Sequence, residues 1–195
     1  MTKYILSWIL MSVVVLSFGQ KPINYNHKKI YKEVGKFLEL EQPEIEEIYL
    51  PDSIIRKNHI QGKYYHVSNK NYSSNYHYIY IGRVNSCRAG GCSISMDPNE
   101  DFNTEYFDYF ILYDSDCSVE LVKVFNYAAT HGHEVSARGW LKQFAGYNGT
   151  DTLEVGKNVD AISGATISVY GITLDVQMKT EILKDMQSLN LLSIR

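Results

Sequence analysis

The C-terminal part of the chain carries an apolar repeat with the period of one helical face. From about Ala165 to Ser188, apolar residues return every three or four positions. The repeat consists of Ile167, Tyr170, Leu174, Met178, Ile182 and Met186, and it is widened by Val169, Ile172, Val176 and Leu183. The pattern predicts an amphipathic helix over 165–188 whose apolar face packs against the rest of the protein.

The middle of the chain has the composition and pattern of β-strands. Tyr, which favours strands, accounts for 16 of the 195 residues. Strands are predicted at 64–68, 76–84, 106–113 and 119–127, with a polar turn at 69–75 and a hairpin loop at 114–118. A helix is predicted over 28–40 and one helical turn over 140–144. Central strands with helices at both ends predict an α+β fold, with a mostly antiparallel central sheet flanked by an N-terminal helix and a long C-terminal amphipathic helix.

Residues 1–19 have the pattern of a secretory signal peptide. Lys3 precedes an uncharged, mostly apolar run over 4–18, and small residues stand at 17 and 19, where a signal peptidase would read them. The run is shorter than the ~20 residues that a membrane-spanning helix needs. We therefore expect an exported protein, and the alternative is an uncleaved N-terminal anchor.

Composition and charge exclude several other classes of protein. Hydrophobic residues make up 45% of the chain and charged residues 21%, which is typical of a globular domain and not of a disordered chain. The formal net charge is -3 and there is no basic block. We therefore expect no nucleic-acid partner, because nucleic-acid binding requires an electropositive surface.

The three cysteines are open to several interpretations. Cys87 and Cys92 are separated by Arg-Ala-Gly-Gly, so the loop between them is able to close as a structural disulfide. The same pair would alternatively form a redox-active dithiol. A third interpretation is a zinc or iron site completed by His131 and His133 or by Cys117, although this spacing is not a strong metal pattern.

The segment before the C-terminal helix has the residue types of an anion site. It reads Asp160-Ala161-Ile162-Ser163-Gly164-Ala165-Thr166. Asp160 or Ser163 is expected to cap the first free backbone N–H groups of the helix, and Gly164 allows a close approach to the backbone. The hydroxyl of Thr166 would lie near the positive end of the helix dipole, a place that suits a phosphate or phosphoester. The alternative is an ordinary capped helix.

The same segment resembles the flavinylation motif of the FMN-binding domain family, Asp-x-x-Ser-Gly-Ala-Thr. That family includes the C subunit of the Na+-translocating NADH:quinone reductase and the G subunit of the Rnf complex. Its FMN is joined through the phosphate to the hydroxyl of the last Thr by a Mg-dependent FAD:protein FMN transferase. The resemblance implies covalent FMN on Thr166, with the motif completed by Asp160, Ser163, Gly164 and Ala165.

A second stretch, 131–140, resembles the flavin loop that precedes the motif in this family. The family loop typically runs Glu-Thr-Pro-Gly-x-Gly, and this chain keeps Glu134, a hydroxyl at Ser136 and Gly139, but not the Pro or the first Gly. The resemblance therefore predicts the attachment of the flavin in this chain, but it does not predict the detailed contacts of the flavin ring.

The wall and the hydrogen-bond donors of a flavin ring are the remaining parts of such a site. The candidates for them are Arg138, Trp140 and Tyr147. The alternative interpretation places Trp140 in the core and leaves Arg138 as a solvated surface charge.

Together these expectations describe an exported electron carrier. We expect an N-terminal helical region over 20–62 and an FMN-binding domain over 63–195, in the periplasm or on the outer face of the inner membrane. Its covalent FMN would relay electrons between a membrane redox complex and a periplasmic partner, with no catalytic residues of its own and no metal. The alternatives are a small flavin-dependent reductase and a disulfide-stapled binding module without flavin.

Overall fold

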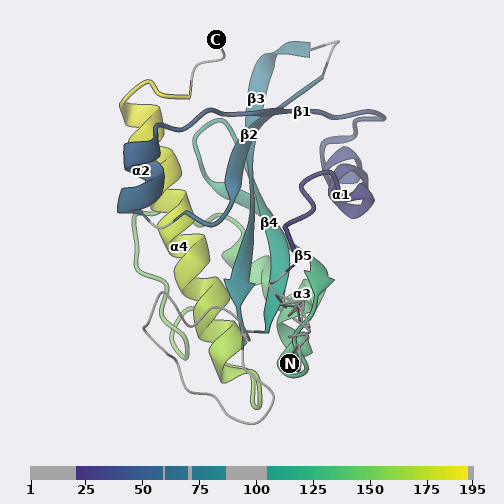
Figure 1. Ribbon diagram of the computed structural model, residues 1–195, viewed down its shortest axis with the longest axis vertical. Helices are drawn as coiled ribbons and strands as arrows, with labels where there is room; N and C mark the ends of the chain where they lie inside the picture. Colours follow the sequence, from purple (N-terminus) through teal and green to yellow (C-terminus); the bar gives the residue numbers. More distant parts are fainter. Residues whose placement is uncertain (1–20, 59, 70–71, 87–104, 193–195) are drawn as a thin grey trace, which may run out of the picture.

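The computed structural model describes residues 21–58, 60–69, 72–86 and 105–192. The predicted signal peptide and the pair Cys87 and Cys92 lie outside these residues. The described part is a β-sheet with a helix packed on each face (Figure 1). No helix of this part is long and apolar enough to cross a membrane.

The sheet is antiparallel throughout, and its strands lie side by side in the order of the sequence. Its strands are β1 (Glu44–Glu47), β2 (Lys63–Asn69), β3 (Tyr72–Asn85), β4 (Tyr106–Tyr113) and β5 (Val119–Tyr127). The strands predicted at 106–113 and 119–127 have these bounds in the structure. Because β1 pairs with β2, residues 44–47 belong to the same sheet as the strands that follow.

The predicted polar turn at 69–75 is wrong in its second half. Strand β3 already begins at Tyr72, and Asn69 of β2 pairs with Tyr72. Backbone pairing supplies the hydrogen bonds of a ladder whatever the polarity of its side chains. A polar sequence can therefore extend a hairpin, and composition alone does not show where the strand begins.

The helices are α1 (Lys28–Leu38), α2 (Asp52–Lys57), α3 (Arg138–Leu141) and α4 (Thr166–Ser188), with short 3-10 turns η2 (His133–Ser136) and η3 (Lys142–Phe144). Helix α4 covers one face of the sheet and α1 covers the other (Figure 1). These findings confirm the α+β prediction, including the long C-terminal helix.

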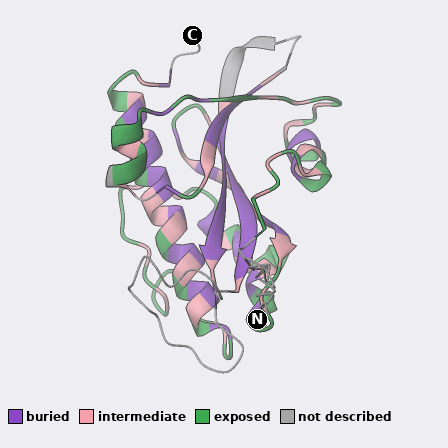
Figure 2. Ribbon diagram, in the orientation of Figure 1, coloured by how far each residue is buried: buried purple, intermediate pink, exposed green. Residues whose placement is uncertain are grey.

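The sheet separates two buried clusters. On the α4 side, Tyr80 and Tyr109 pack with Ile172, and on the α1 side Ile79 and Phe110 pack with α1. Neighbouring residues of one strand enter opposite clusters because strand side chains alternate between faces. Figure 2 shows the buried residues concentrated in the sheet and on the side of α4 that faces it. Strand β4 is buried along its whole length.

The buried face of α4 is not centred on the predicted apolar repeat. Tyr170 and Leu174 are 56% and 59% exposed, whereas Val169, Ile172 and Val176, predicted as flanks, are buried. Three polar side chains, Thr173, Lys179 and Thr180, are buried with them. The prediction that Tyr170 and Leu174 belong to the packed face is therefore wrong, because the rotation of the helix turns Val169, Ile172 and Val176 toward the sheet instead.

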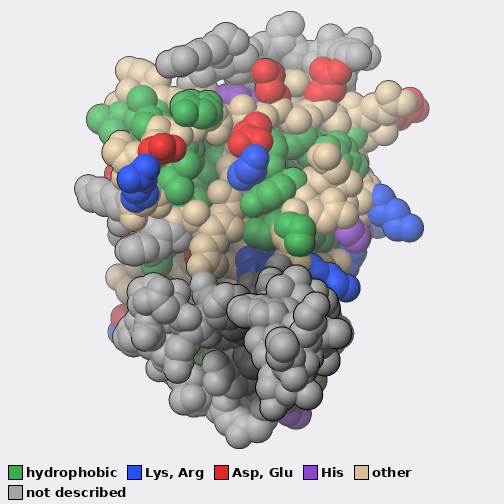
Figure 3. All heavy atoms as spheres, viewed as in Figure 1, with side chains coloured by type: hydrophobic (Ala, Val, Ile, Leu, Met, Phe, Trp, Pro, Cys, Tyr) green, Lys and Arg blue, Asp and Glu red, His purple; other side chains and the backbone are tan. Residues whose placement is uncertain are grey.

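The described surface carries charges of both signs. On the upper part of the face in Figure 3, Lys and Arg side chains are interspersed with Asp and Glu among apolar residues. This mixture agrees with the sequence, which has no basic block.

Candidate functional site

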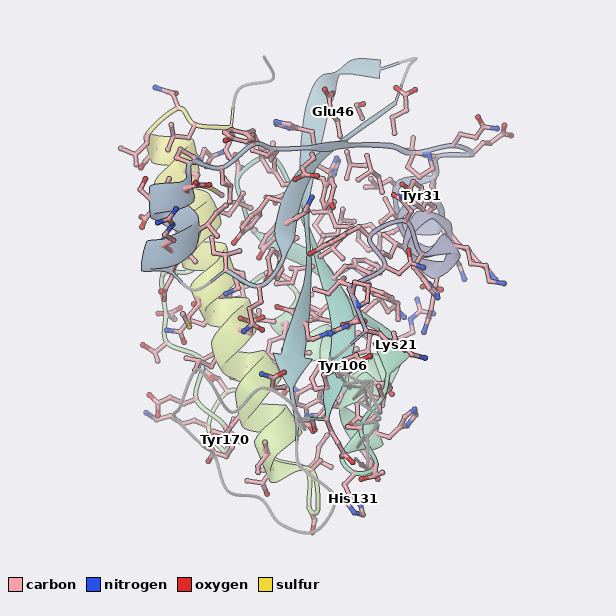
Figure 4. The ribbon with its side chains drawn as sticks, viewed as in Figure 1. Lys21, Tyr31, Glu46, Tyr106, His131 and Tyr170 are labelled. Carbon is pink, nitrogen blue, oxygen red and sulfur yellow. The ribbon has the colours of Figure 1, made fainter. Side chains whose placement is uncertain are left out.

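The first turn of α4 is fastened to the ends of β3 and β5. The hydroxyl oxygens of Ser168 and Ser86 lie 2.6 Å apart, and both residues are buried. The Tyr127 hydroxyl lies 3.4 Å from the same Ser168 oxygen and donates to the His131 carbonyl at 2.5 Å. These contacts fix the start of the helix at one end of the sheet, close to the loop that begins at His131 (Figure 4).

A glycine brings that loop against the helix. Gly132 has a φ of +79°, and a Cβ built on it would lie 2.5 Å from the Ser168 hydroxyl oxygen. Both the backbone conformation and the close approach therefore require glycine. The ring of the next residue, His133, meets the Tyr127 ring edge to face at 5.1 Å. The structure thus brings the loop 131–136 and the start of α4 together.

Trp140 and a residue that sequence reasoning missed hold the beginning of the motif. The Trp140 indole N–H donates to the Asp160 carbonyl at 2.9 Å, and the Asp160 N–H donates to the Gln143 side-chain oxygen at 2.7 Å. Trp140 also meets the Phe144 ring edge to face at 5.4 Å. The backbone of Asp160 is therefore fixed on both sides, while Asp160 itself stays exposed. Gln143 lies three residues after Trp140, so helical spacing was the available signal for it.

The motif itself forms a tight turn with an open side. The Ala165 N–H donates to the Ile162 carbonyl at 3.1 Å, and Gly164 has a φ of +79°. A Cβ on Gly164 would meet no described residue within 4 Å. Ser163 and Gly164 are exposed, whereas Ala165 is 3% exposed and packs into the core. The turn is thus anchored at Ala165 and leaves space beside Gly164.

Among the described residues, no side chain caps the start of α4. Helix α4 begins at Thr166, which is exposed, and Ala165 occupies the N-cap position without a side-chain hydrogen bond. The prediction that Asp160 or Ser163 caps the helix is therefore wrong. The reason is that the turn places Ala165 at the cap, and alanine has no acceptor. The first backbone N–H groups consequently keep the capacity to bind an anion.

Two of the predicted loop residues make only local contacts. Ser136 donates its hydroxyl to the His133 carbonyl at 2.6 Å within η2. Glu134 is exposed. Both lie in the loop that Gly132 brings against α4, and their roles toward a flavin stay predictions.

Arg138 and Tyr147 lie apart from the start of α4. Arg138 lines a pocket of about 270 Å³ with Phe37 and Leu121, and two positions along a helical turn place it nearly opposite Trp140. Tyr147 is close to Glu181, and burial raises its pKa to about 12. Glu181 lies about 22 Å along the axis of α4 from Thr166. The structure therefore does not bring Tyr147 to Thr166, and the role of Arg138 stays a prediction.

Of the three cysteines, Cys117 lies among the residues that the structure describes. Cys117 is fully buried in the hairpin between β4 and β5, and burial raises the pKa of its thiol to about 12. In the described ranges, no three His, Cys, Asp or Glu side chains gather as a metal site would require. The disulfide and the redox dithiol of Cys87 and Cys92 fall outside those ranges and stay predictions.

Comparison with known protein families supports the resemblance that the motif suggested. Residues 107–178 match the FMN-binding domain family. This range runs from β4 into α4 and contains both the loop 131–140 and the motif at 160–166. No curated protein and no solved structure matches the chain. This match identifies residues 107–178 with the FMN-binding domain, and it supports FMN as the cofactor.

Proposed function

We propose that the protein is an exported electron carrier whose FMN is esterified through its phosphate to the hydroxyl of Thr166. The observation that carries the proposal is the exposed Thr166 at the first position of a helix with no side-chain cap. A transferase needs to reach the acceptor hydroxyl, and the exposure of Thr166 allows this.

The residues present fit a phosphoester at this position. The uncapped N–H groups and the helix dipole favour a negative group by about 0.3–1 kcal/mol, and the open side of the turn at Gly164 leaves it space. The chain has no described side chain that competes for these N–H groups as a cap. When bound, FMN would supply the one- and two-electron chemistry, and the protein would hold and orient it.

In the proposed attachment reaction, FAD is the donor of the FMN group. The Thr166 oxygen forms a new bond to the FMN phosphorus, the phosphoanhydride bond of FAD breaks, AMP leaves and the hydroxyl proton is released. In this proposal, Trp140 and Gln143 act before that step, because they fix the backbone of Asp160 and so present its carboxylate to the FAD:protein FMN transferase.

The role in electron relay completes the proposal. The signal pattern of residues 1–19 supports export to the periplasm or to the outer face of the inner membrane. There the flavin would accept electrons from a membrane redox complex and pass them to a periplasmic partner.

The test is the intact mass of the protein co-expressed with an FAD:protein FMN transferase. We expect the mass of one FMN less one water in the wild-type chain and in Thr166→Ser, which keeps a hydroxyl. Thr166→Ala should lack the adduct and unfold at the same temperature, because an exposed helix start tolerates alanine. The same spectrum shows whether residues 1–19 have been removed.

Two results would contradict the proposal. A wild-type chain without added mass would show that Thr166 is not an acceptor. An adduct that persists in Thr166→Ala would place the attachment at another residue.

A further inference from the structure

The exposed face of α4 carries an apolar surface directly beyond Thr166. Tyr170 and Leu174 are 56% and 59% exposed, and both follow Thr166 at a spacing of four residues, which places all three on one helical face. Figure 4 shows Tyr170 near the beginning of α4, on the side away from the sheet. We call Tyr170 and Leu174 the α4 platform.

The rotation of α4 that exposes this platform is fixed by its close contact with the sheet. A Cβ on Gly171 would lie 2.8 Å from a methyl carbon of Val84, so the helix lies against β3 at this point. Val169 and Ile172 are buried against the sheet, and this rotation of the helix leaves Tyr170 facing outward. The exposure of Tyr170 is therefore a consequence of the packing of α4 and not of a loosely attached helix.

The direction of helical side chains brings the platform toward the predicted attachment point. Side chains of a helix lean toward its N-terminus, so the Tyr170 ring leans over the turn that contains Thr166. Tyr170 lies about 6 Å and Leu174 about 12 Å along the axis from Thr166. A group tethered to the Thr166 hydroxyl thus has an aromatic ring beside it and an apolar side chain beyond that ring.

We propose that the isoalloxazine ring of the FMN attached to Thr166 stacks on Tyr170, with its dimethylbenzene edge toward Leu174. This inference rests on the proposed function, because the tether defines which group reaches the platform. The flexible ribityl arm separates the phosphate from the ring and allows the ring to lie back along the helix. Aromatic rings in offset contact attract each other beyond the effect of burial alone. Tyr170 is accordingly a cofactor-contacting residue.

The test uses full-length protein loaded with covalent FMN and compares two tyrosine variants. Tyr170→Leu keeps an apolar side chain but removes the ring. The matched control is Tyr49→Leu, because Tyr49 is 77% exposed and lies between β1 and α2. Intact mass first establishes that each protein carries the adduct. Thermal unfolding followed by circular dichroism confirms that the fold is kept.

The readout is the fluorescence of the bound flavin in the folded protein relative to the same sample unfolded in urea. A phenol in contact with the excited flavin ring quenches it by donating an electron that then returns to the phenol. Stacking favours the contact state by about fivefold, so we expect the fluorescence of Tyr170→Leu to be about fivefold higher than that of the wild-type protein. Tyr49→Leu should match the wild-type protein.

The possible outcomes separate this inference from the proposed function. If Tyr170→Leu carries the adduct and its fluorescence equals that of the wild-type protein, the ring lies elsewhere, on the loop 131–136 or in solvent, and the inference is wrong. If the wild-type protein carries no adduct, the proposed function is wrong, and the stacking inference falls with it.

Discussion

The two faces of α4 depart in part from the usual rule for amphipathic helices, in which apolar residues face the core and polar residues face the solvent. The face against the sheet contains Lys179 and Thr180, which are 3% and 0% exposed, whereas the outward face carries Tyr170 and Leu174. The difference shows that polar residues enter a core when they find partners there. It also shows that an apolar repeat does not by itself tell which side of a helix will pack.

The buried polar groups are satisfied within α4 and by the tyrosines of the sheet. Lys179 pairs with Asp175 at 3.0 Å, and the Tyr109 hydroxyl donates to the other Asp175 oxygen at 2.5 Å. The Tyr64 hydroxyl donates to the Lys179 carbonyl at 2.9 Å. Burial holds the pKa of Tyr64 and of Tyr109 well above the usual value, so both remain protonated donors.

The largest change in stability is expected when this buried pair of Lys179 and Asp175 is broken. Asp175→Ala should lower the free energy of unfolding by about 3 kcal/mol, because it leaves the Lys179 ammonium buried without its partner. The control is Leu174→Ala on the outward face, where the change should be within about 0.5 kcal/mol. Urea unfolding measures both. Equal losses in the two variants would show that the faces do not differ as described.

A smaller effect comes from the contact that sets the rotation of α4. Gly171→Val should lower the free energy of unfolding by about 2 kcal/mol, because the added side chain overlaps Val84. Adding Val84→Ala to the same chain should recover part of the loss, since it removes the overlapping methyl groups. If Gly171→Val unfolds like the wild-type protein, the helix does not press on β3, and the outward position of Tyr170 needs another cause.

The smallest changes in stability are expected for two tyrosines that pack on the buried face of α4. Tyr64→Phe should lower the free energy of unfolding by about 1 kcal/mol, because the buried hydrogen bond from the Tyr64 hydroxyl to the Lys179 carbonyl is lost. Tyr80→Phe should raise it by about 1 kcal/mol, because the buried Tyr80 hydroxyl has no hydrogen-bond partner among the described residues. Chemical unfolding at neutral pH distinguishes the two, and changes of the same sign would contradict the prediction.

The strands and helices were largely predictable because their signals are local. The runs at 106–113 and 119–127 are apolar, aromatic and bounded by a polar loop, so the structure gives them the predicted limits. The start of β3 at Tyr72 was not predictable in the same way, because its hydrogen bonds come from pairing with β2 and not from its composition.

In the candidate site, too, the features carried by consecutive residues were predictable and the long-range contacts were not. The motif at 160–166 was visible in the sequence because its chemistry lies in consecutive residues. The contact of Gly132 with Ser168, and the hold of Gln143 on Asp160, join residues far apart in the chain. No periodicity or motif within one segment reports such contacts.

The sequence by itself determined the α+β class, the long last helix and the match of residues 107–178 to the FMN-binding domain family. Each depends on patterns that neighbouring residues carry along the chain. The tertiary structure decided which face of α4 is buried, because the packing of Val169, Ile172 and Val176 in the core sets the rotation of the helix. It also decided that the helix begins uncapped at Thr166, because Trp140, Gln143 and the core position of Ala165 place the preceding turn.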